Sequence, residues 1–348
     1  MTDRPSTCVV LLPTSQTVPE HELSCHEAVG ASLARLMNVP FAGRSQPDRD
    51  AKPYYIPSDT LTSLAEAARL GIRSEADLFG GVVPEPYMAG KAISHPLVET
   101  PRCRPPGWAD RLHALAGNAV LPGFSAFCID DARDAALRML ADGPIRLKPV
   151  RAKAGRGQAV ISDADELAAA LALMDEAELN TWGLVVERNL SQVETYSVGQ
   201  VRAAGVVASY CGIQHLTPDD NGQMVYGGSD LYVVRGDYHA LLDCTAVRDY
   251  RVAINQARQY EKAALQALSG MLLSRRNYDV ASGLNPNGGR VSGVLEQSWR
   301  IGGASGAELA ALEAFAADPS LTFVEASTIE RYGAGQPVPE GAAVVYSG

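Results

Sequence analysis

The chain has 348 residues, of which 46% are hydrophobic and 20% are charged, which is the composition of a soluble globular protein. Its length predicts two or three domains, and its net charge of −10 argues against nucleic-acid binding, which requires a basic face. No apolar run reaches the length of a membrane helix and the six cysteines form no C-x-x-C pair, so we expect a cytoplasmic protein with reduced thiols.

The first hundred residues alternate between strand-like and helical patterns. Residues 7–13 and 54–56 predict strands, and helical spacing runs from His21 to Met37 and from Leu61 to Leu70. A third strand is expected over 77–83. This alternation predicts a parallel sheet built from βαβ units. The first strand is not followed by G-x-G-x-x-G, so we expect no dinucleotide site there.

The proline-rich segment 100–107 marks the first domain boundary. Beyond it, strands and helices continue to alternate until a segment rich in strands, a clear turn at 219–222 and a long helix. The expected elements are helices over 109–115, 129–140 and 248–273, strands over 120–127 and 183–187, and strand-rich hairpins over 195–215.

Residues 144–162 predict a strand, a basic loop that contains glycine, and a second strand. Pro149 ends the hydrogen-bond ladder just after Lys148. Glycines let backbone N–H groups approach an anion, and basic side chains neutralise phosphate charge. The loop residues assigned to a phosphate in this way are Arg151, Lys153, Gly155, Arg156 and Gly157. The alternative is a solvated basic hairpin turn, because short glycine motifs often occur without a ligand.

Two pairs of carboxylates follow the basic loop. Glu187 and Glu194 flank the exit of a buried strand, where the backbone from Arg188 to Leu190 can read an adenine edge and a carboxylate can bind ribose. Without other support, this pair is better explained as two surface glutamates at a turn.

The second pair, Asp279 and Glu296, lies on two strands joined by the turn 285–289, so we expect the strands to be antiparallel neighbours. Carboxylates together with phosphate oxygens are the usual ligands of Mg²⁺. Ser298 and Arg300 follow on the face of Glu296, and Arg300 can neutralise a phosphate or an acyl phosphate. The alternative is an ordinary salt bridge between Arg300 and one of the carboxylates.

The order of these motifs resembles the ATP-grasp superfamily over residues 108–310, and it ends in Glu-x-x-x-Arg-x-Gly-Gly. The segments Arg-Leu-Lys-Pro and Ser-Trp-Arg-Ile-Gly-Gly most resemble an uncharacterised bacterial family with an ATP-grasp core. The resemblance implies an α/β and α+β chain in which two α+β subdomains clasp a nucleotide after a Rossmann-like α/β domain. The expected domains are 1–105, 106–190 with the glycine loop, and 191–348 with the metal site.

The resemblance also implies roles for the nucleotide-binding residues. Lys148 and the loop 151–157 contact the phosphates of ATP, while Glu187 and Glu194 are associated with adenine and ribose. The lysine that often precedes the first grasp strand in this superfamily has no clear match. Arg111 lies nearest to its place, and Lys91 is a poorer candidate.

At the other end of the site, the resemblance implies that Asp279, Glu296 and Ser298 bind Mg²⁺, or Mn²⁺ in its place. Ser298 replaces the usual asparagine, which suggests that a second metal is held more weakly or through water. Arg300 matches the arginine that stabilises the transferring group, and Arg276, three residues before Asp279, is assigned the same role.

We therefore expect an ATP- and Mg²⁺-dependent ligase that converts a small-molecule carboxylate into an acyl phosphate for attack by an amine or a thiol. We expect neither a nucleic acid nor a membrane as partner, and association into a homo-oligomer is left open. One alternative is an ATP-binding regulatory protein with a degenerate, non-catalytic grasp site. Another is a non-nucleotide α/β protein whose basic loop contacts an acidic partner.

Overall fold

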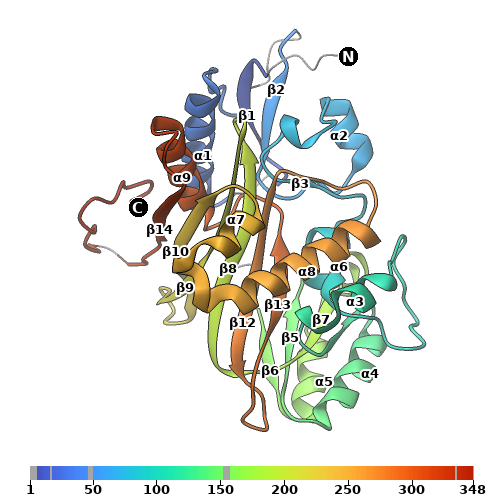
Figure 1. Ribbon diagram of the computed structural model, residues 1–348. Coiled ribbons are helices and arrows are strands. Elements are labelled where there is room, and N and C mark those ends of the chain that lie inside the picture. The colour runs from blue at the N-terminus through green and yellow to red at the C-terminus, as the bar shows by residue number, and fades with distance from the viewer. Residues whose placement is uncertain (1–5, 16–17, 46–49, 152–156, 334, 348) are drawn as a thin grey trace.

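The computed structural model describes residues 6–15, 18–45, 50–151, 157–333 and 335–347 (Figure 1). Its N-terminal part contains two parallel strands that pair in register, and two helices flank them. Asn38 and Gly71 end these helices in the left-handed conformation, at φ 54° and 82°. The four elements are β1 (Cys8–Leu12), α1 (Glu20–Met37), β2 (Pro53–Pro57) and α2 (Leu64–Leu70).

The middle part is a four-stranded sheet in the order β4-β7-β5-β6, covered by helices that bury alanine and leucine against it. Asp163 and Asp175 cap two of the helices by accepting backbone N–H bonds. The elements are α3 (Arg111–Ala116), β4 (Gly123–Ala126), α4 (Ile129–Leu140), β5 (Ile145–Pro149), β6 (Ala159–Ile161), α5 (Ala164–Ala172), α6 (Glu176–Trp182) and β7 (Leu184–Arg188).

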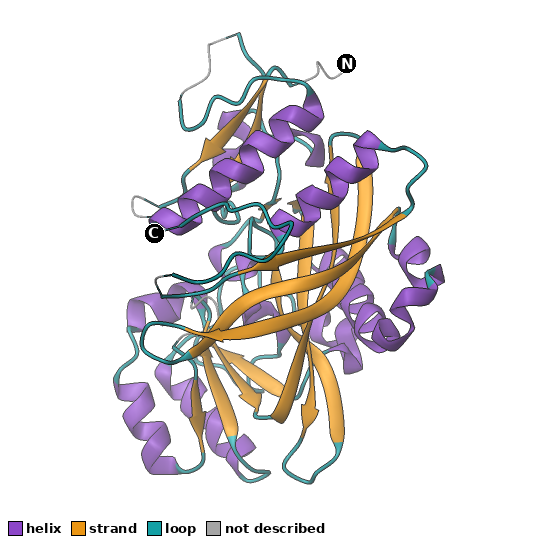
Figure 2. Ribbon diagram, turned by 90° about the vertical axis from the view of Figure 1, so that its left-hand side faces the viewer, coloured by secondary structure: helices purple, strands orange, loops and turns teal. Residues whose placement is uncertain are grey.

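The C-terminal part is a six-stranded sheet in the order β13-β12-β8-β9-β10-β14, and its long strands curve across the molecule (Figure 2). Helix α8 packs on one face of this sheet, while α9 packs on the other face together with α1 (Figure 1). The elements are β8 (Ser191–Ala203), β9 (Val206–Pro218), β10 (Met224–Arg235), α7 (Tyr238–Asp243), α8 (Arg251–Ala267), β11 (Leu272–Leu273), β12 (Arg275–Leu284), β13 (Arg290–Ser298), α9 (Ser305–Ala317) and β14 (Phe323–Ile329).

The structure corrects three boundaries. The helix expected from Leu61 begins only at Leu64, because Ser63 rather than 58–60 is its cap. The strand expected over 77–83 is limited to β3 (Gly81–Val82), which pairs antiparallel with β11. The helix expected to reach residue 273 ends at Ala267. Among the described residues, no helix has the length and apolarity required to cross a membrane.

Candidate functional site

A short segment from the N-terminal part lies between the two larger sheets and joins the candidate residues. It contains the 3-10 turn η3 (Lys91–Ser94), which contacts β4 and β7 on one side and β13 on the other. The Oγ of Ser125 donates to the backbone oxygen of Ala92, and Gln297 Nε2 donates to that of Gly90 over 2.6 Å. Side chains of this segment therefore reach residues of both sheets.

On the four-stranded sheet, a buried ionic group surrounds Glu187. Glu187 Oε1 lies 2.8 Å from Lys148 Nζ, and Glu187 Oε2 lies 3.2 Å from His95 Nε2. Burial raises the pKa of Glu187, but the charge of Lys148 and the bond to His95 outweigh burial and hold the pKa below its usual value. Glu187 therefore carries a negative charge that orients the ammonium group of Lys148.

On the six-stranded sheet, Glu296 is paired with a second lysine. Lys91 Nζ lies 2.7 Å from its Oε2, and only 3% of the Lys91 side chain is exposed. Burial raises the pKa of Glu296, but the charges of Lys91, then Lys148 and Arg300, lower it below the usual value. Because Lys148 acts electrostatically on Glu296, the two sheets contribute to one charged site.

Asp279 lies directly opposite Glu296 on the neighbouring strand β12. One extra residue of β13 forms a bulge between this pair and the next pair, Val280 and Val294. Burial, followed by the charge of Glu296, raises the pKa of Asp279 to about 6. The two carboxylates therefore repel each other, and a cation between them would remove this repulsion.

Two carboxylates with nearby lysines suit a Mg²⁺ ion that also takes phosphate oxygens. In the described part of the chain, no group of three or more His, Cys, Asp or Glu side chains is arranged to hold a metal by itself. Asp279 and Glu296 therefore fit a cation that arrives with a phosphorylated ligand better than a permanently bound metal.

Ser298 and Arg300 follow Glu296 along the chain. Ser298 lies opposite Asn277, and its Oγ accepts a hydrogen bond of 3.3 Å from Arg275. Arg300 Nε lies 3.6 Å from Asp59 Oδ1, in the segment after β2, and a quarter of the Arg300 side chain is exposed. Arg300 therefore lies between the carboxylates and the N-terminal part, and it is open to a ligand.

The residues predicted to read the nucleotide base, 188–190, lie at the end of β7 and directly after it. The backbone N–H groups of Arg188 and Asn189 donate to Pro122 and Pro144, and Leu190 is buried. Glu194 lies exposed on β8 and accepts from the hydroxyl of Tyr196. Nothing in these contacts tests the predicted roles in base and ribose binding, which remain predictions.

The basic loop is described only at its two ends. The Arg151 guanidinium lies over the ring of Trp182, 5.1 Å from its centroid. Gly157 has φ 68°, a left-handed conformation that favours glycine. The predictions for Lys153, Gly155 and Arg156 lie outside the described residues.

Two predicted residues are placed elsewhere. Arg276 forms ion pairs with Glu75 and Glu261 at 2.8 and 3.2 Å. Since it is three residues from Asp279 on one strand, its side chain projects from the opposite face of the sheet, so the prediction that it stabilises the transferring group is wrong. Arg111 donates to the backbone oxygen of Gln266 in α8, and Lys91 rather than Arg111 contacts Glu296.

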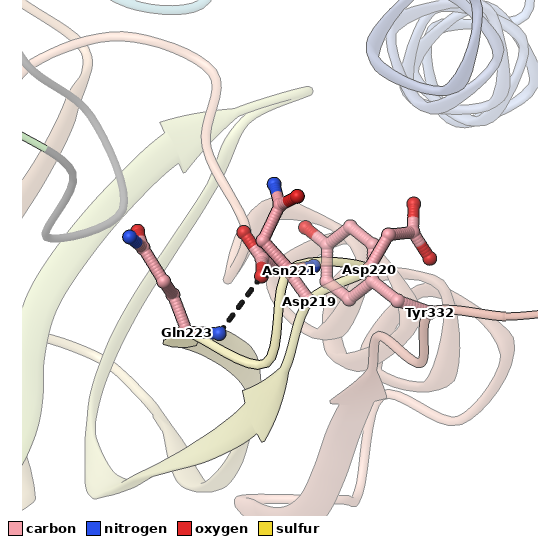
Figure 3. Close-up of a pocket in the computed structure, with 5 residues that line it drawn as sticks. All are labelled: Asp219, Asp220, Asn221, Gln223 and Tyr332. Carbon is pink, nitrogen blue, oxygen red and sulfur yellow. Dashed lines mark hydrogen bonds between the residues drawn. The ribbon is translucent and has the colours of Figure 1, made fainter.

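A shallow hollow at the turn between β9 and β10 offers an alternative location. It is lined by Asp219, Asp220, Asn221, Gln223 and Tyr332, and the backbone N–H of Gln223 donates to Asp219 (Figure 3). The Asp219 carboxylate stabilises the turn by accepting from the backbone N–H groups of Asn221 and Gln223, and none of the described contacts joins the hollow to the network around Glu187 and Glu296. The site formed by that network is therefore the stronger candidate.

Several solved structures are similar to most of the chain. D-Alanine–D-alanine ligase from Bacillus anthracis has a TM-score of 0.51 and 12% identity, and the match covers 89% of this chain and 93% of that one. D-Alanyl-alanine synthetase A from Vibrio cholerae (0.45, 11%, covering 85% and 89%) and N5-carboxyaminoimidazole synthetase from Staphylococcus aureus (0.43, 12%, covering 85% and 71%) are also similar.

The first of these similarities shows that the chain has the ATP-grasp fold. The curated proteins contain no match to this chain. A family model covers residues 9–348, which is nearly the full sequence. The chain therefore belongs to the family described as "Protein of unknown function (DUF3182)".

Proposed function

We propose that this protein is an ATP- and Mg²⁺-dependent ligase that activates a carboxylate as an acyl phosphate for attack by an amine or a thiol. The observation that carries the proposal is the connected charged site formed by Lys148 and Glu187 of one sheet and Asp279 and Glu296 of the other, with Lys91 between them. Two ammonium groups and two carboxylates are suited to a metal-bound polyphosphate.

At the nucleotide end of this site, Lys148 contacts the phosphates. Glu187 holds Lys148 in place, since one of its oxygens is bonded to Lys148 and the other to His95. Adenine recognition is then assigned to the backbone at Leu190, and ribose binding to Glu194. Arg151 and Gly157 belong to the loop that contacts the phosphates from the other side.

At the reacting end, Asp279 and Glu296 would hold Mg²⁺, which would supply charge neutralisation to the phosphate oxygens. If Mg²⁺–ATP binds, Glu296 would hold the cation in place of Lys91, and the Lys91 ammonium group would be available to the phosphates. Arg300 would stabilise the phosphoryl group as it moves from ATP to the oxygen of the substrate carboxylate, with ADP as the leaving group. The nucleophile then attacks the acyl carbon, and phosphate leaves.

The test is ADP release from Mg²⁺–ATP with amino acids and small diacids, each combined with amines or thiols. We expect at least one combination to release ADP, and Lys148→Ala to abolish the release. Lys262→Ala is a matched control, because Lys262 is an exposed lysine of α8. If isothermal titration detects no binding of Mg²⁺–ATP to the wild-type protein, the proposal is refuted.

An ATP-binding regulatory protein is the second candidate. One observation favours it. The Ser298 hydroxyl accepts a hydrogen bond from Arg275, at the position where the superfamily has a metal-binding asparagine. Binding of Mg²⁺–ATP without ADP release for every substrate pair would support this candidate over the ligase.

A further inference from the structure

His95 is a buried histidine to which the proposed mechanism assigns no role. It directly follows the 3-10 turn η3, and its side chain is 0% exposed. The ring lies against Gly123 of β4, which is the register partner of Glu187 in β7. A Cβ added at Gly123 would lie 2.9 Å from both His95 Nδ1 and His95 Cε1. The glycine therefore leaves the space that the ring needs to lie beside Glu187.

Only one of the two ring nitrogens of His95 has a hydrogen-bond partner among the described residues. Nε2 lies 3.2 Å from Glu187 Oε2, whereas no described residue bonds to Nδ1. A buried nitrogen without a partner lowers the stability of a protein, so an apolar side chain would serve packing better at this position. The presence of a histidine is therefore explained by the contact that Nε2 makes with Glu187.

The hydrogen of this contact is assigned from the charge of Glu187. Burial raises the pKa of Glu187, but the charge of Lys148 and then the bond to His95 hold the pKa below its usual value. An ionised carboxylate only accepts hydrogen bonds, so Nε2 carries the hydrogen and donates it to Oε2. His95 therefore fixes one oxygen of Glu187 and leaves the other, Oε1, to Lys148.

The division of Glu187 between two donors determines how many donors Lys148 keeps for a ligand. Lys148 Nζ lies 2.8 Å from Glu187 Oε1, and 4% of the Lys148 side chain is exposed. An ammonium group has three N–H donors, and within the described part of the chain this is the only hydrogen bond that Lys148 Nζ makes. The remaining donors suit phosphate oxygens. Without the bond from His95, Oε2 would be free to turn to Lys148 and take one of them.

We propose that His95 is a positioning residue for nucleotide binding. By donating to Glu187 Oε2, it prevents Glu187 from taking a second N–H of Lys148, so that this donor stays available to the phosphates. The proposal rests on the proposed function, in which Lys148 contacts the phosphates of ATP. It also gives the N-terminal part, from which His95 comes, a direct effect on the phosphate-binding lysine.

The test compares the affinities of variants for Mg²⁺–ADP by isothermal titration. We expect His95→Leu to weaken binding about 10-fold, and His95→Gln to stay within about threefold of the wild-type protein, because glutamine keeps an N–H donor for Oε2. His113→Leu is the matched control, because His113 also has a buried Nδ1 to which no described residue bonds, and we expect it to bind as the wild-type protein does. Circular dichroism checks that each variant folds.

A second measurement uses the wild-type protein without nucleotide, so it does not depend on the proposed function. Long-range proton–nitrogen correlation spectra show which ring nitrogen of a histidine carries the hydrogen, and the signals of His95 are identified by their absence in His95→Gln. We expect the hydrogen on Nε2. A neutral ring with its hydrogen on Nδ1 would overturn the inference, because Nε2 could not then donate to Glu187.

The outcomes separate this inference from the proposed function. If the wild-type protein does not bind Mg²⁺–ADP, both are wrong. If it binds Mg²⁺–ADP and His95→Leu binds equally well, only the role of His95 is wrong. The same conclusion follows if His95→Gln or His113→Leu loses as much affinity as His95→Leu, because the loss would then not come from the donor on Glu187.

Discussion

Replacing Asp279 by asparagine should make the metal-free protein more stable while it removes metal binding. Each pKa unit corresponds to about 1.36 kcal/mol, so a pKa raised from 3.8 to about 6 means that ionising Asp279 costs about 3 kcal/mol more in the folded chain than in the unfolded chain. Gln214 and Asn277 both donate to the same oxygen, Oδ1, and an amide oxygen can accept these bonds as well. We therefore expect a gain of about 1–3 kcal/mol at pH 8.

The sign of the pH dependence makes this prediction specific. Because the pKa is raised in the folded state, the protonated form is favoured, and its contribution to stability is present below about pH 4 and lost as the pH rises through about 6. The advantage of Asp279→Asn should therefore be largest at pH 8 and fall to about a third of that value at pH 4.5. Urea unfolding with EDTA measures both.

The control is Asp249→Asn, which changes an exposed carboxylate and should leave the free energy of unfolding within about 0.5 kcal/mol. A variant of Asp279 that is less stable than the wild-type protein at pH 8, or whose advantage does not change with pH, would refute the reasoning. Retention of Mg²⁺–ATP affinity in this variant would refute the metal assignment instead.

Glu296→Gln should act in the opposite direction and lower the free energy of unfolding by about 2 kcal/mol, because the nearly buried Lys91 loses its carboxylate partner. Urea unfolding at pH 7 that shows no loss would contradict this. Lys148→Met should cost about 3–5 kcal/mol in the same assay, since Glu187 is left as a buried charge, and the added change Glu187→Gln should recover part of the loss. Gly303→Ala should lower the free energy of unfolding by about 1–3 kcal/mol, because the added Cβ would lie 2.2 Å from the Tyr226 ring. Adding Tyr226→Leu should recover part of this loss, and thermal melting that shows no recovery would contradict the prediction.

Part of the candidate site could be predicted from the sequence because local rules determine it. The Asn- and Gly-rich turn 285–289 indicated a hairpin, and the structure pairs β12 with β13 so that Asp279 lies opposite Glu296. Alternation along a strand also excludes Arg276 from the face of Asp279, and this signal was present in the three-residue spacing. The bulge beside Glu296 was not predictable, because nothing in the local pattern around Leu295 marks the extra residue.

Lys91 was ranked behind Arg111 and His95 was missed for a different reason. They lie in and just after a 3-10 turn, which has no helical or strand periodicity, and a buried lysine has the same sequence signature as an exposed one. Lys91 is paired with a residue 205 positions later, and His95 with one 92 positions later. The only signal in the sequence was the presence of polar residues in an apolar segment, Lys91-Ala-Ile-Ser-His95.

The helix that was expected to extend to residue 273 illustrates the limit of apolar periodicity. Leu268, Leu272 and Leu273 continue the apolar pattern of α8, but Gly270 has φ 79° and turns the chain into β11. Strand β11 then pairs with β3 of the N-terminal part. This pairing determines the structure of residues 272–273. The partner strand β3 is far away in the sequence, so the local apolar pattern does not predict the pairing.

The balance of charges in the site argues for a ligand rather than for a structural role. Two carboxylates placed side by side on adjacent strands lower the stability of a sheet, and the pKa of Asp279 is raised first by burial and then by the charge of Glu296. A structural ion pair would need only Lys91 and Glu296, so Asp279 would be dispensable. The presence of Asp279 is explained if a divalent cation occupies the site during function. A cation between the two carboxylates removes their repulsion, and this gain in free energy favours binding of the cation.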